Sequence, residues 1–301
     1  MIAAPPAQNR PLGIALRLGA ALCFAIMAAL IKLGYDRGAH IVETIFFRFA
    51  FGVPPLLAWI AATGRWDAWR TRRPRAHLTR AAIGLTAMSL SFASLGFLPL
   101  AEATTISFAA PLFGTILAAS WLREPVGRHR WTAVLLGFGG VLVVMRPDAA
   151  LLPLAGVAVA LLAAVAVAWV TVAIRSISRT DAPETTVLWF TATAMLVVGA
   201  AMPAFAQPHD LGTFAVLAGI GLAGGVGQLL MTSSLRLAPV ATLVPFDYTQ
   251  LIWAVLLGWL IWRTQPPPST LAGAAIIVAG GLYTIYREHR LGRERAREPV
   301  I

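Results

Sequence analysis

Ten apolar runs, separated by short polar connections, follow one another along this chain. An α-helix rises about 1.5 Å per residue, so a run of about 20 residues just crosses a hydrocarbon core about 30 Å thick. The runs therefore predict an all-α polytopic membrane protein with ten transmembrane helices. We place these helices at residues 12–34, 41–62, 78–98, 102–122, 130–146, 151–174, 184–205, 211–235, 239–262 and 269–287.

The composition excludes an ordinary soluble fold. Hydrophobic residues make up 58% of the 301 residues, charged residues make up 12%, and the mean hydropathy is +0.75. A globular domain is nearer one quarter charged and could not bury so much apolar surface. The first run is too long for the apolar part of a signal peptide, so we expect no cleavage there. The single cysteine, Cys23, lies inside that run, which excludes an intrachain disulfide.

The basic residues gather on one side of the expected membrane. The formal net charge of +11 would at first suggest a nucleic-acid partner. With the amino terminus placed in the cytoplasm, however, 19 of the 24 Lys and Arg residues fall on the cytoplasmic side and 3 on the outer side. Such a bias over short loops is the positive-inside signal. It predicts a multi-pass protein of a bacterial inner membrane, both termini in the cytoplasm, a basic cytoplasmic tail at 288–301 and no nucleic-acid partner.

The stretch 101–146 has a degraded copy at 239–287. The matches keep their order, namely Ala103-Thr104 with Ala241-Thr242, Phe108 with Phe246, Trp121 with Trp259 and Gly140 with Gly280. Each half has five helices, which is an odd number. The second half, 151–287, therefore enters the membrane from the side opposite to the one from which the first half, 12–146, enters. Inverted repeats of this kind are typical of alternating-access transporters. The alternative is a structural or enzymatic ten-helix membrane protein with an accidental repeat.

Four motifs stand in a characteristic order: Phe47-Arg48-Phe49, Pro111, the run from Trp121 to Pro125, and the glycine-bounded run from Gly273 to Gly280. Together with the ten helices, they resemble the EamA type of the drug/metabolite transporter superfamily over nearly the whole chain. The resemblance implies a cavity lined mainly by the first, third, fourth, sixth, eighth and ninth helices. It also implies amino acids or related small metabolites as substrates, and a structural role for Arg48 as often as a binding one.

The chain departs from that family pattern at one place. The family often has a glutamate after the ninth helix, which would match Glu124 after the fourth. Here the position reads Arg263-Thr264-Gln265. The sequence therefore gives no support to a symmetric pair of glutamates.

The helix at 102–122 carries candidate residues of the substrate pathway. Thr104, Phe108, Pro111 and Thr115 are spaced by four, three and four residues, which places them on one helix face. Pro111 frees a backbone carbonyl, which a membrane helix tolerates where it lines a cavity or meets another helix. We therefore expect a kinked, partly polar face on the central pathway. The alternative is that both threonine hydroxyls bond to their own helix backbone.

The helix at 239–262 repeats this design, with Pro245 followed by Asp247, Tyr248 and Gln250. Asp247 lies about 12 Å into the membrane at the helical rise, where an ionised carboxylate is expensive. It should therefore be protonated, paired or in contact with water. Gln250 shares its face. The functional interpretation is that Asp247 binds a substrate ammonium group or carries a coupling proton. The alternatives are a neutral Asp bonded to a neighbouring backbone, or an ion pair with Arg48.

Two further polar residues lie inside expected helices. Arg48 costs about 2.5–3.5 kcal/mol at a helix centre unless it meets an acid, carbonyls or an anionic substrate group. The amide of Gln228 needs partners at its depth, and the substrate is one candidate. Gly221 and Gly225, in the same helix as Gln228, have the small-xxx-small spacing that favours close helix packing over substrate contact.

Lys32 and Glu43 lie near the outer ends of the first two helices, across a short turn. We expect an ion pair between them, or snorkelling of the lysine towards the interface. Arg48 is five residues beyond Glu43, about 140° around the helix, so these two are poor partners.

The sequence contains no cluster suited to catalysis or metal binding. The five histidines fall at helix ends, in loops or in the tail, without metal-ligand spacing. No nucleophile–base pair and no phosphate loop is present. We therefore expect a transporter of small organic metabolites, with no enzymatic activity, no metal and no cofactor. Its partners would be the small-molecule substrate, membrane lipid and, as a candidate coupling ion, protons. The alternative is a lipid-handling or scrambling protein with a lateral groove, which small residues facing lipid on 78–98 and 211–235 would favour.

Overall fold

The computed structural model describes residues 9–64, 66–121, 123, 127–145, 152–178 and 180–295. Within these residues every regular element is a helix, which confirms the all-α class. The α-helices are α1 (Arg10–Asp36), α2 (Ile41–Ala50), α3 (Val53–Thr63), α4 (Pro74–Phe97), α5 (Leu100–Ser107), α6 (Ala110–Ser120), α7 (Arg128–Met145), α8 (Leu154–Ile177), α9 (Pro183–Phe205), α10 (Leu211–Leu237), α11 (Val240–Leu243), α12 (Thr249–Trp262) and α13 (Pro268–Arg295). Two 3-10 helices, η1 (Trp66–Trp69) and η2 (Val244–Tyr248), complete the set.

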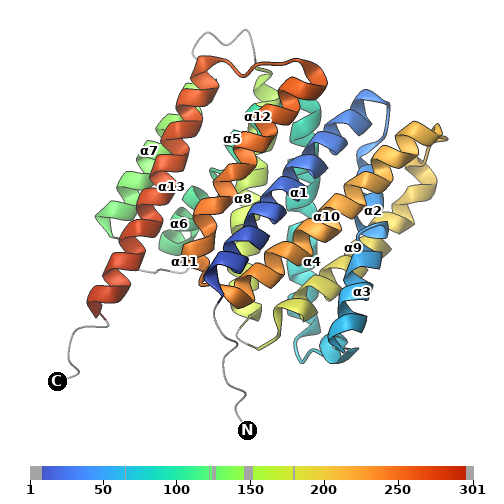
Figure 1. Cartoon of the computed structure of the whole chain (residues 1–301), viewed down its shortest axis with the longest axis horizontal. Helices are drawn as coiled ribbons and strands as arrows, with labels where there is room; N and C mark the ends of the chain where they lie inside the picture. Colours follow the sequence, from blue (N-terminus) through green and yellow to red (C-terminus); the bar gives the residue numbers. More distant parts are fainter. Residues whose placement is uncertain are drawn as a thin grey trace.

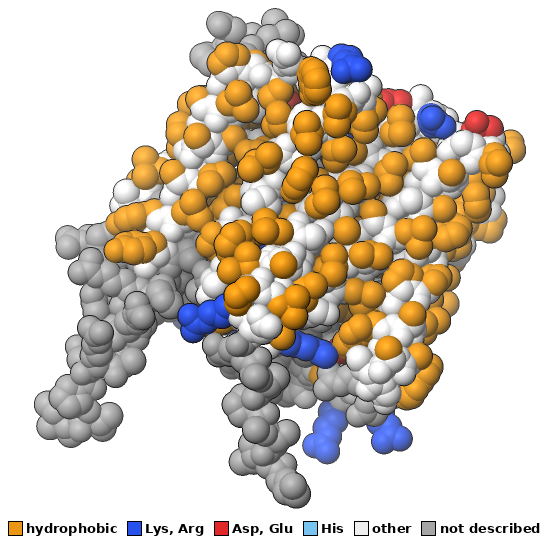
Figure 2. Space-filling model, in the orientation of Figure 1, with side chains coloured by type: hydrophobic (Ala, Val, Ile, Leu, Met, Phe, Trp, Pro, Cys, Tyr) orange, Lys and Arg blue, Asp and Glu red, His pale blue; other side chains and the backbone are white. Residues whose placement is uncertain are grey.

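The described residues contain eight spans that are long and apolar enough to cross a membrane. Two shorter apolar helices, Val134–Met145 and Pro268–Tyr283, bring the number to ten. These segments coincide with the ten expected runs, although several begin or end a few residues away. Their outward side chains are apolar, and Leu211 and Leu196 are 84% and 75% exposed. Figure 2 shows a wide apolar face with charged side chains only near its edges, as a lipid-facing surface requires.

Three of the ten spans are interrupted next to prolines. α2 and α3 separate before Pro54, α5 and α6 separate before Pro111, and η2, which contains Pro245, stands between α11 and α12. Proline lacks a backbone N–H and its ring clashes with the preceding turn, so a helix cannot continue regularly through it. The expected kinks at Pro111 and Pro245 are confirmed, while the break before Pro54 was not foreseen.

The hydrophobic core is shared between the two halves of the chain. α1 packs on α10, α4 on α8 and α7 on α13, and the interrupted spans pack as α2 on α9 and α5 on α12. Each of these pairs joins a helix of the first half to one of the second. In Figure 1, α7 and α13 lie at one side, α1 and α10 cross the front, and α2, α3 and α9 lie at the other side. The largest buried cluster accordingly contains side chains from both halves, among them Phe49, Phe92, Val157 and Leu217.

Glycines of α10 allow its closest helix contacts. A Cβ added to Gly225 would lie 2.9 Å from the Cα of Gly52, and one added to Gly221 would overlap the carbonyl oxygen of Phe47. Both contacts are with backbone, so α10 could not lie so near α2 and α3 with larger residues. The small-xxx-small spacing therefore serves close helix packing, which the sequence analysis favoured over substrate contact.

Candidate functional site

A central cavity of about 180 Å³ lies among α1, α4, α5, α8 and α12. Its wall is largely apolar and includes Phe24 of α1 and Ala160 of α8. Hydrogen-bonding side chains enter it from both halves, namely Ser91, Ser94, Thr104, Ser107 and Gln250. The family resemblance implied these five helices and also α10, which contributes no residue to the described lining. A pocket of this kind, apolar with a few polar groups, suits a small organic ligand.

Two aromatic rings join the interrupted spans beside this cavity. Phe108 follows α5 and Tyr248 ends η2, and their ring centroids are 4.9 Å apart. Thr104 lies one turn before Phe108, and Gln250 lies two residues after Tyr248. The structure thus brings together four of the expected pathway residues, two from each copy of the repeated stretch.

The threonine hydroxyls of this region bond to their own backbone. Thr104 Oγ1 donates to the carbonyl oxygen of Leu100 at 2.7 Å, and Thr115 Oγ1 donates to that of Pro111 at 3.2 Å. This is the alternative that the sequence left open. Pro111 and Thr115 also lie outside the described lining of the central cavity. The four-residue spacing assumed a continuous helix, and the break after Phe108 changes the direction in which α6 presents its side chains.

Asp247 pairs with Arg17 of α1, so the pair that the sequence suggested with Arg48 is wrong. Arg17 Nε lies 2.5 Å from Oδ1 of Asp247, and Arg17 Nη2 lies 2.6 Å from Oδ2. A two-point contact between a guanidinium and a carboxylate is stronger and more directional than a neutral hydrogen bond. Arg17 is 8% exposed. The pair therefore fixes η2 to α1. From the sequence alone, Arg17 had been counted only as one of the cytoplasmic arginines.

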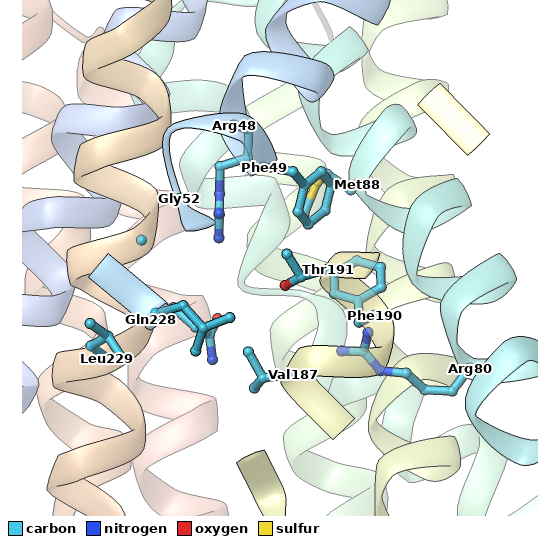
Figure 3. A pocket seen from close by; sticks show the side chains of 12 residues that line it. Arg48, Phe49, Gly52, Arg80, Met88, Val187, Phe190, Thr191, Gln228 and Leu229 are labelled. Atoms are coloured by element: carbon cyan, nitrogen blue, oxygen red, sulfur yellow. The ribbon is translucent and has the colours of Figure 1, made fainter. Parts of the chain in front are cut away.

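Arg48 and Gln228 line a different cavity, of about 80 Å³, among α2, α3, α4, α9 and α10. Figure 3 shows Arg48 pointing into this space, with Gln228 on one side and Arg80 on the other. The amide of Gln228 makes one long hydrogen bond, from Nε2 to Thr232 Oγ1 at 3.4 Å. Arg48 and Gln228 were expected on the substrate pathway, yet the described lining of the central cavity includes neither of them.

The ion pair expected between Lys32 and Glu43 is also wrong. Lys32 Nζ donates to the carbonyl oxygens of Leu95 and Leu98, each at 3.1 Å, at the end of α4. Glu43 instead lies 2.8 Å from His209 Nε2, in the connection between α9 and α10. Each charged group takes the partner that helix packing brings to it, and depth along two neighbouring helices could not identify that partner.

Sequence reasoning missed two contributors. Arg80 was counted with the cytoplasmic arginines, but it lies against Phe190, 4.0 Å from the ring centroid, and lines the Arg48 cavity. Ser91 lies among small residues in the sequence, and the structure places it in the wall of the central cavity. The only sequence feature that could have indicated this position is the number of serine and threonine residues in 78–98. Across the part of the chain that the structure describes, no group of three His, Cys, Asp or Glu could hold a metal ion.

Comparison with known proteins places these features in a family. The model of the EamA-like transporter family matches residues 11–146 and again residues 154–286. A riboflavin transporter of Vibrio cholerae is 28% identical over 298 residues, which are 96% of this chain and 98% of that protein. An S-adenosylmethionine uptake transporter of Rickettsia bellii is 28% identical over 83% of this chain and 86% of its own length.

Two further similarities extend this result. The pseudopaline exporter CntI of Pseudomonas aeruginosa is 28% identical over 88% of this chain and 93% of its own length. One crystal structure, 20% identical in sequence, covers 94% of this chain and 99% of its own with a TM-score of 0.62. That likeness concerns the fold alone.

Proposed function

Since this chain belongs to the EamA-like transporter family, and is a small-molecule transporter rather than an enzyme, we propose that it carries a small organic metabolite through the central cavity by alternating access. One observation carries the proposal: the cavity lies between the halves, with its polar side chains drawn from both of them. A site at the interface of two halves can be exposed to one side of the membrane and then to the other as the halves move.

The lining indicates the kind of substrate. Most of the wall is apolar, and the few polar groups are hydroxyls and one amide, without a carboxylate or a basic side chain among the described lining residues. Such a wall favours a ligand with an apolar body and a few hydrogen-bonding groups. Amino acids and related small metabolites, which the family resemblance implies, stay the proposed substrate class, and the hydroxyl and amide groups of the wall can form hydrogen bonds to their polar groups. The curated relatives are named for riboflavin, S-adenosylmethionine and pseudopaline, and they include both an importer and an exporter.

Helix packing supports two inverted five-helix halves, 12–146 and 151–287. If a two-fold relation in the membrane plane exchanges the halves, the contact of the first helix with the eighth must recur as a contact of the sixth with the third. α1 packs on α10 and α8 packs on α4, which is that exchange. The contact between the fifth and tenth helices, α7 and α13, is also compatible with the exchange, because the exchange maps this pair onto itself. The family model matches residues 11–146 and 154–286, close to these bounds.

We propose that both termini face the cytoplasm of a bacterial cell, whose inner membrane the protein crosses. α1 begins and α13 ends at the same edge of the molecule, the lower edge in Figure 1. Exposed arginines concentrate at that edge, including Arg70, Arg72 and Arg73 in the connection before α4 and Arg75 in its first turn. The positive-inside rule then assigns this edge to the cytoplasm, together with the basic tail at 288–301.

The small residues of α10 do not support the lipid-handling alternative. Small residues of α10 were expected to face lipid in that case, but Gly221, Gly224 and Gly225 are buried against α2 and the turn that follows it. Membrane lipid is still a proposed partner, because it would surround the exposed apolar surface.

The test is transport by the purified full-length protein in proteoliposomes, using a panel of amino acids, riboflavin and S-adenosylmethionine, with and without a pH gradient. We expect saturable movement of at least one solute, reduced about tenfold by Gln250→Leu, because one hydrogen bond to the substrate is lost. Gln207→Leu, at an exposed residue between α9 and α10, is the matched control and should leave transport unchanged. Lipid scrambling without movement of any solute would overturn the proposal in favour of the alternative, and an effect of the pH gradient would identify protons as the coupling ion.

A further inference from the structure

We propose that the cavity among α2, α4, α9 and α10 is a binding site for a phosphate group, held by Arg48 and Arg80. This site has its own lining, distinct from that of the central cavity, and the inference does not depend on the substrate that is transported. Met88 of α4 lines the phosphate site and Ser91 lines the central cavity, so the two cavities are about one helical turn apart along that helix.

Both guanidinium groups have unused donors in a buried place. Arg48 is only 8% exposed, and its Nε has no hydrogen-bond acceptor among the residues that the structure describes. The same is true of Nε and Nη1 of Arg80. The described lining of the cavity includes no carboxylate. A buried cation without a partner is strongly unfavourable, and two such cations facing one cavity call for an anion between them.

Aromatic rings hold the two guanidinium groups in place. Arg80 lies over Phe190, 4.0 Å from the ring centroid, and Arg48 lies 5.5 Å from the ring centroid of Phe49. Phe49 and Phe190 pack edge to face, with centroids 5.3 Å apart. A guanidinium that rests on an aromatic face keeps its in-plane N–H groups available for an oxyanion. The rings thus orient the arginines without neutralising them.

The remaining donors favour phosphate over carboxylate. A single arginine can satisfy both oxygens of a carboxylate, whereas a phosphate group offers more acceptors than one guanidinium can fill. Gln228 and Thr191 also line the cavity and can donate to such an oxygen. Figure 3 shows Thr191 between the two arginines in this view, and Gln228 across from Arg80. The volume of about 80 Å³ exceeds the roughly 10–15 Å³ that one water needs.

Glycines make room for the Arg48 side chain. A Cβ on Gly224 of α10 would overlap Nε of Arg48, and one on Gly52 would lie 3.0 Å from Nη1. The turn between α2 and α3 therefore passes beside the guanidinium because position 52 has no side chain. Gly224→Ala would displace the guanidinium without changing any charge, which gives a test of geometry that is separate from a test of charge.

The phosphate group can come from a soluble molecule or from a phospholipid headgroup, and two probes distinguish these sources. The first is inorganic phosphate, compared with chloride at equal ionic strength, added to delipidated full-length protein in a neutral detergent. The second is phosphatidylglycerol in nanodiscs, compared with nanodiscs of phosphatidylcholine alone, whose phosphate charge is balanced by the choline ammonium group. A ligand that binds only the folded protein raises its melting temperature. A response to the first probe alone identifies a soluble phosphate compound, a response to the second alone identifies an anionic lipid, and a response to both shows that the site accepts a phosphate group from either source.

The variants locate the response. Arg48→Gln and Arg80→Gln should each raise the half-maximal concentration of the effective probe by about tenfold or more, because charged hydrogen bonds are lost. Gly224→Ala should weaken the response while keeping both charges, and Arg48→Lys should retain part of it. Arg75→Gln, at an exposed arginine of the same helix as Arg80, is the matched control and should respond like the wild type. The inference is overturned if the wild type gains no stability from either probe, or if Arg80→Gln responds as strongly as Arg75→Gln.

Discussion

The two interrupted spans at the centre of the molecule are built alike but are held differently. Each begins with a short helical segment, breaks next to a proline and continues as a longer helix, α6 in the first half and α12 in the second. The second span is fixed to α1 by the ion pair of Arg17 and Asp247. The first span carries Glu102 near its start instead, and this buried carboxyl accepts a hydrogen bond from Thr270 Oγ1 of α13 at 3.1 Å.

The difference concerns the two ends of the pathway. The chain enters α5 at the upper edge of Figure 1 and α11 at the lower edge, so the two carboxyl groups lie towards opposite ends. The contact towards the lower end joins opposite charges, and the contact towards the upper end joins a carboxyl and a hydroxyl. A movement that separates α1 from η2 would break the charged contact of Arg17 with Asp247, whereas one that separates α5 from α13 would break the hydrogen bond between Glu102 and Thr270. Similar halves can therefore be held with unequal strength.

The largest effect is expected from breaking the charged contact. Arg17→Gln or Asp247→Asn leaves one charge without its partner, which costs about 3–5 kcal/mol at a fully buried pair and less here, because the Asp247 side chain is 33% exposed. We expect transport in proteoliposomes to fall at least about tenfold in either variant. Exchange of the two residues, Arg17→Asp with Asp247→Arg, should restore part of it. Strictly additive losses in the double variant would mean that the two residues do not act as a pair.

A smaller effect is expected from restoring a continuous helix. Pro111→Ala supplies the missing N–H and removes the ring, so the break between α5 and α6 should shorten. Transport should fall about threefold to tenfold while insertion and abundance stay near those of the wild type. Pro245→Ala is the matched change in the other span. If neither variant alters transport, the breaks are packing features, and the likeness of the two spans has no functional meaning.

The neutral contact should tolerate a change that the charged contact does not. Glu102→Gln keeps the shape of the side chain and an oxygen that can accept from Thr270, so transport should stay within about twofold of the wild type. The measurement is the same proteoliposome assay, with Asp247→Asn assayed beside it. A loss as large as that of Asp247→Asn would show that both ends depend on a negative charge, and would remove the asymmetry.

The smallest effect is expected at Thr115. Its hydroxyl bonds to the carbonyl oxygen of Pro111, and its side chain lies outside the described lining of the central cavity. Thr115→Val should therefore change transport by less than about twofold. A larger loss would place α6 on the pathway after all, as the helical spacing first suggested.

Local rules were sufficient for much of the fold. The ten spans follow from apolar runs long enough to cross lipid, and the breaks at Pro111 and Pro245 follow from the chemistry of proline. The packing role of Gly221 and Gly225 follows from their spacing. Thr104, Phe108, Tyr248 and Gln250 could be selected because they lie near the start of repeated, proline-containing segments.

Partners between distant helices could not be predicted in this way. Arg17 and Asp247 are 230 residues apart, and their contact depends on how α1 packs against η2. Arg80 was counted with the cytoplasmic arginines because the positive-inside rule considers only the side of the membrane near which a residue lies. Its guanidinium lies over the ring of Phe190 and lines the Arg48 cavity. The sequence determines which groups need partners, and the packing of the helices decides which partners they find.

The proposed transport requires alternating access of the central cavity, and a single thiol can test it. Cys23 is the only cysteine, so Cys23→Ala provides a background without thiols, and Ser107→Cys places one thiol in the wall of the cavity. A membrane-impermeant maleimide is applied to right-side-out and to inside-out vesicles. Gln207→Cys, in the connection between α9 and α10, reports the sidedness of the vesicles, because it should react from the outside only.

If the halves move as proposed, the thiol at position 107 reacts from both sides of the membrane, and more slowly when a transported solute is present. Reaction from only one side, or from neither, while the control thiol reacts as expected, would contradict alternating access through this cavity.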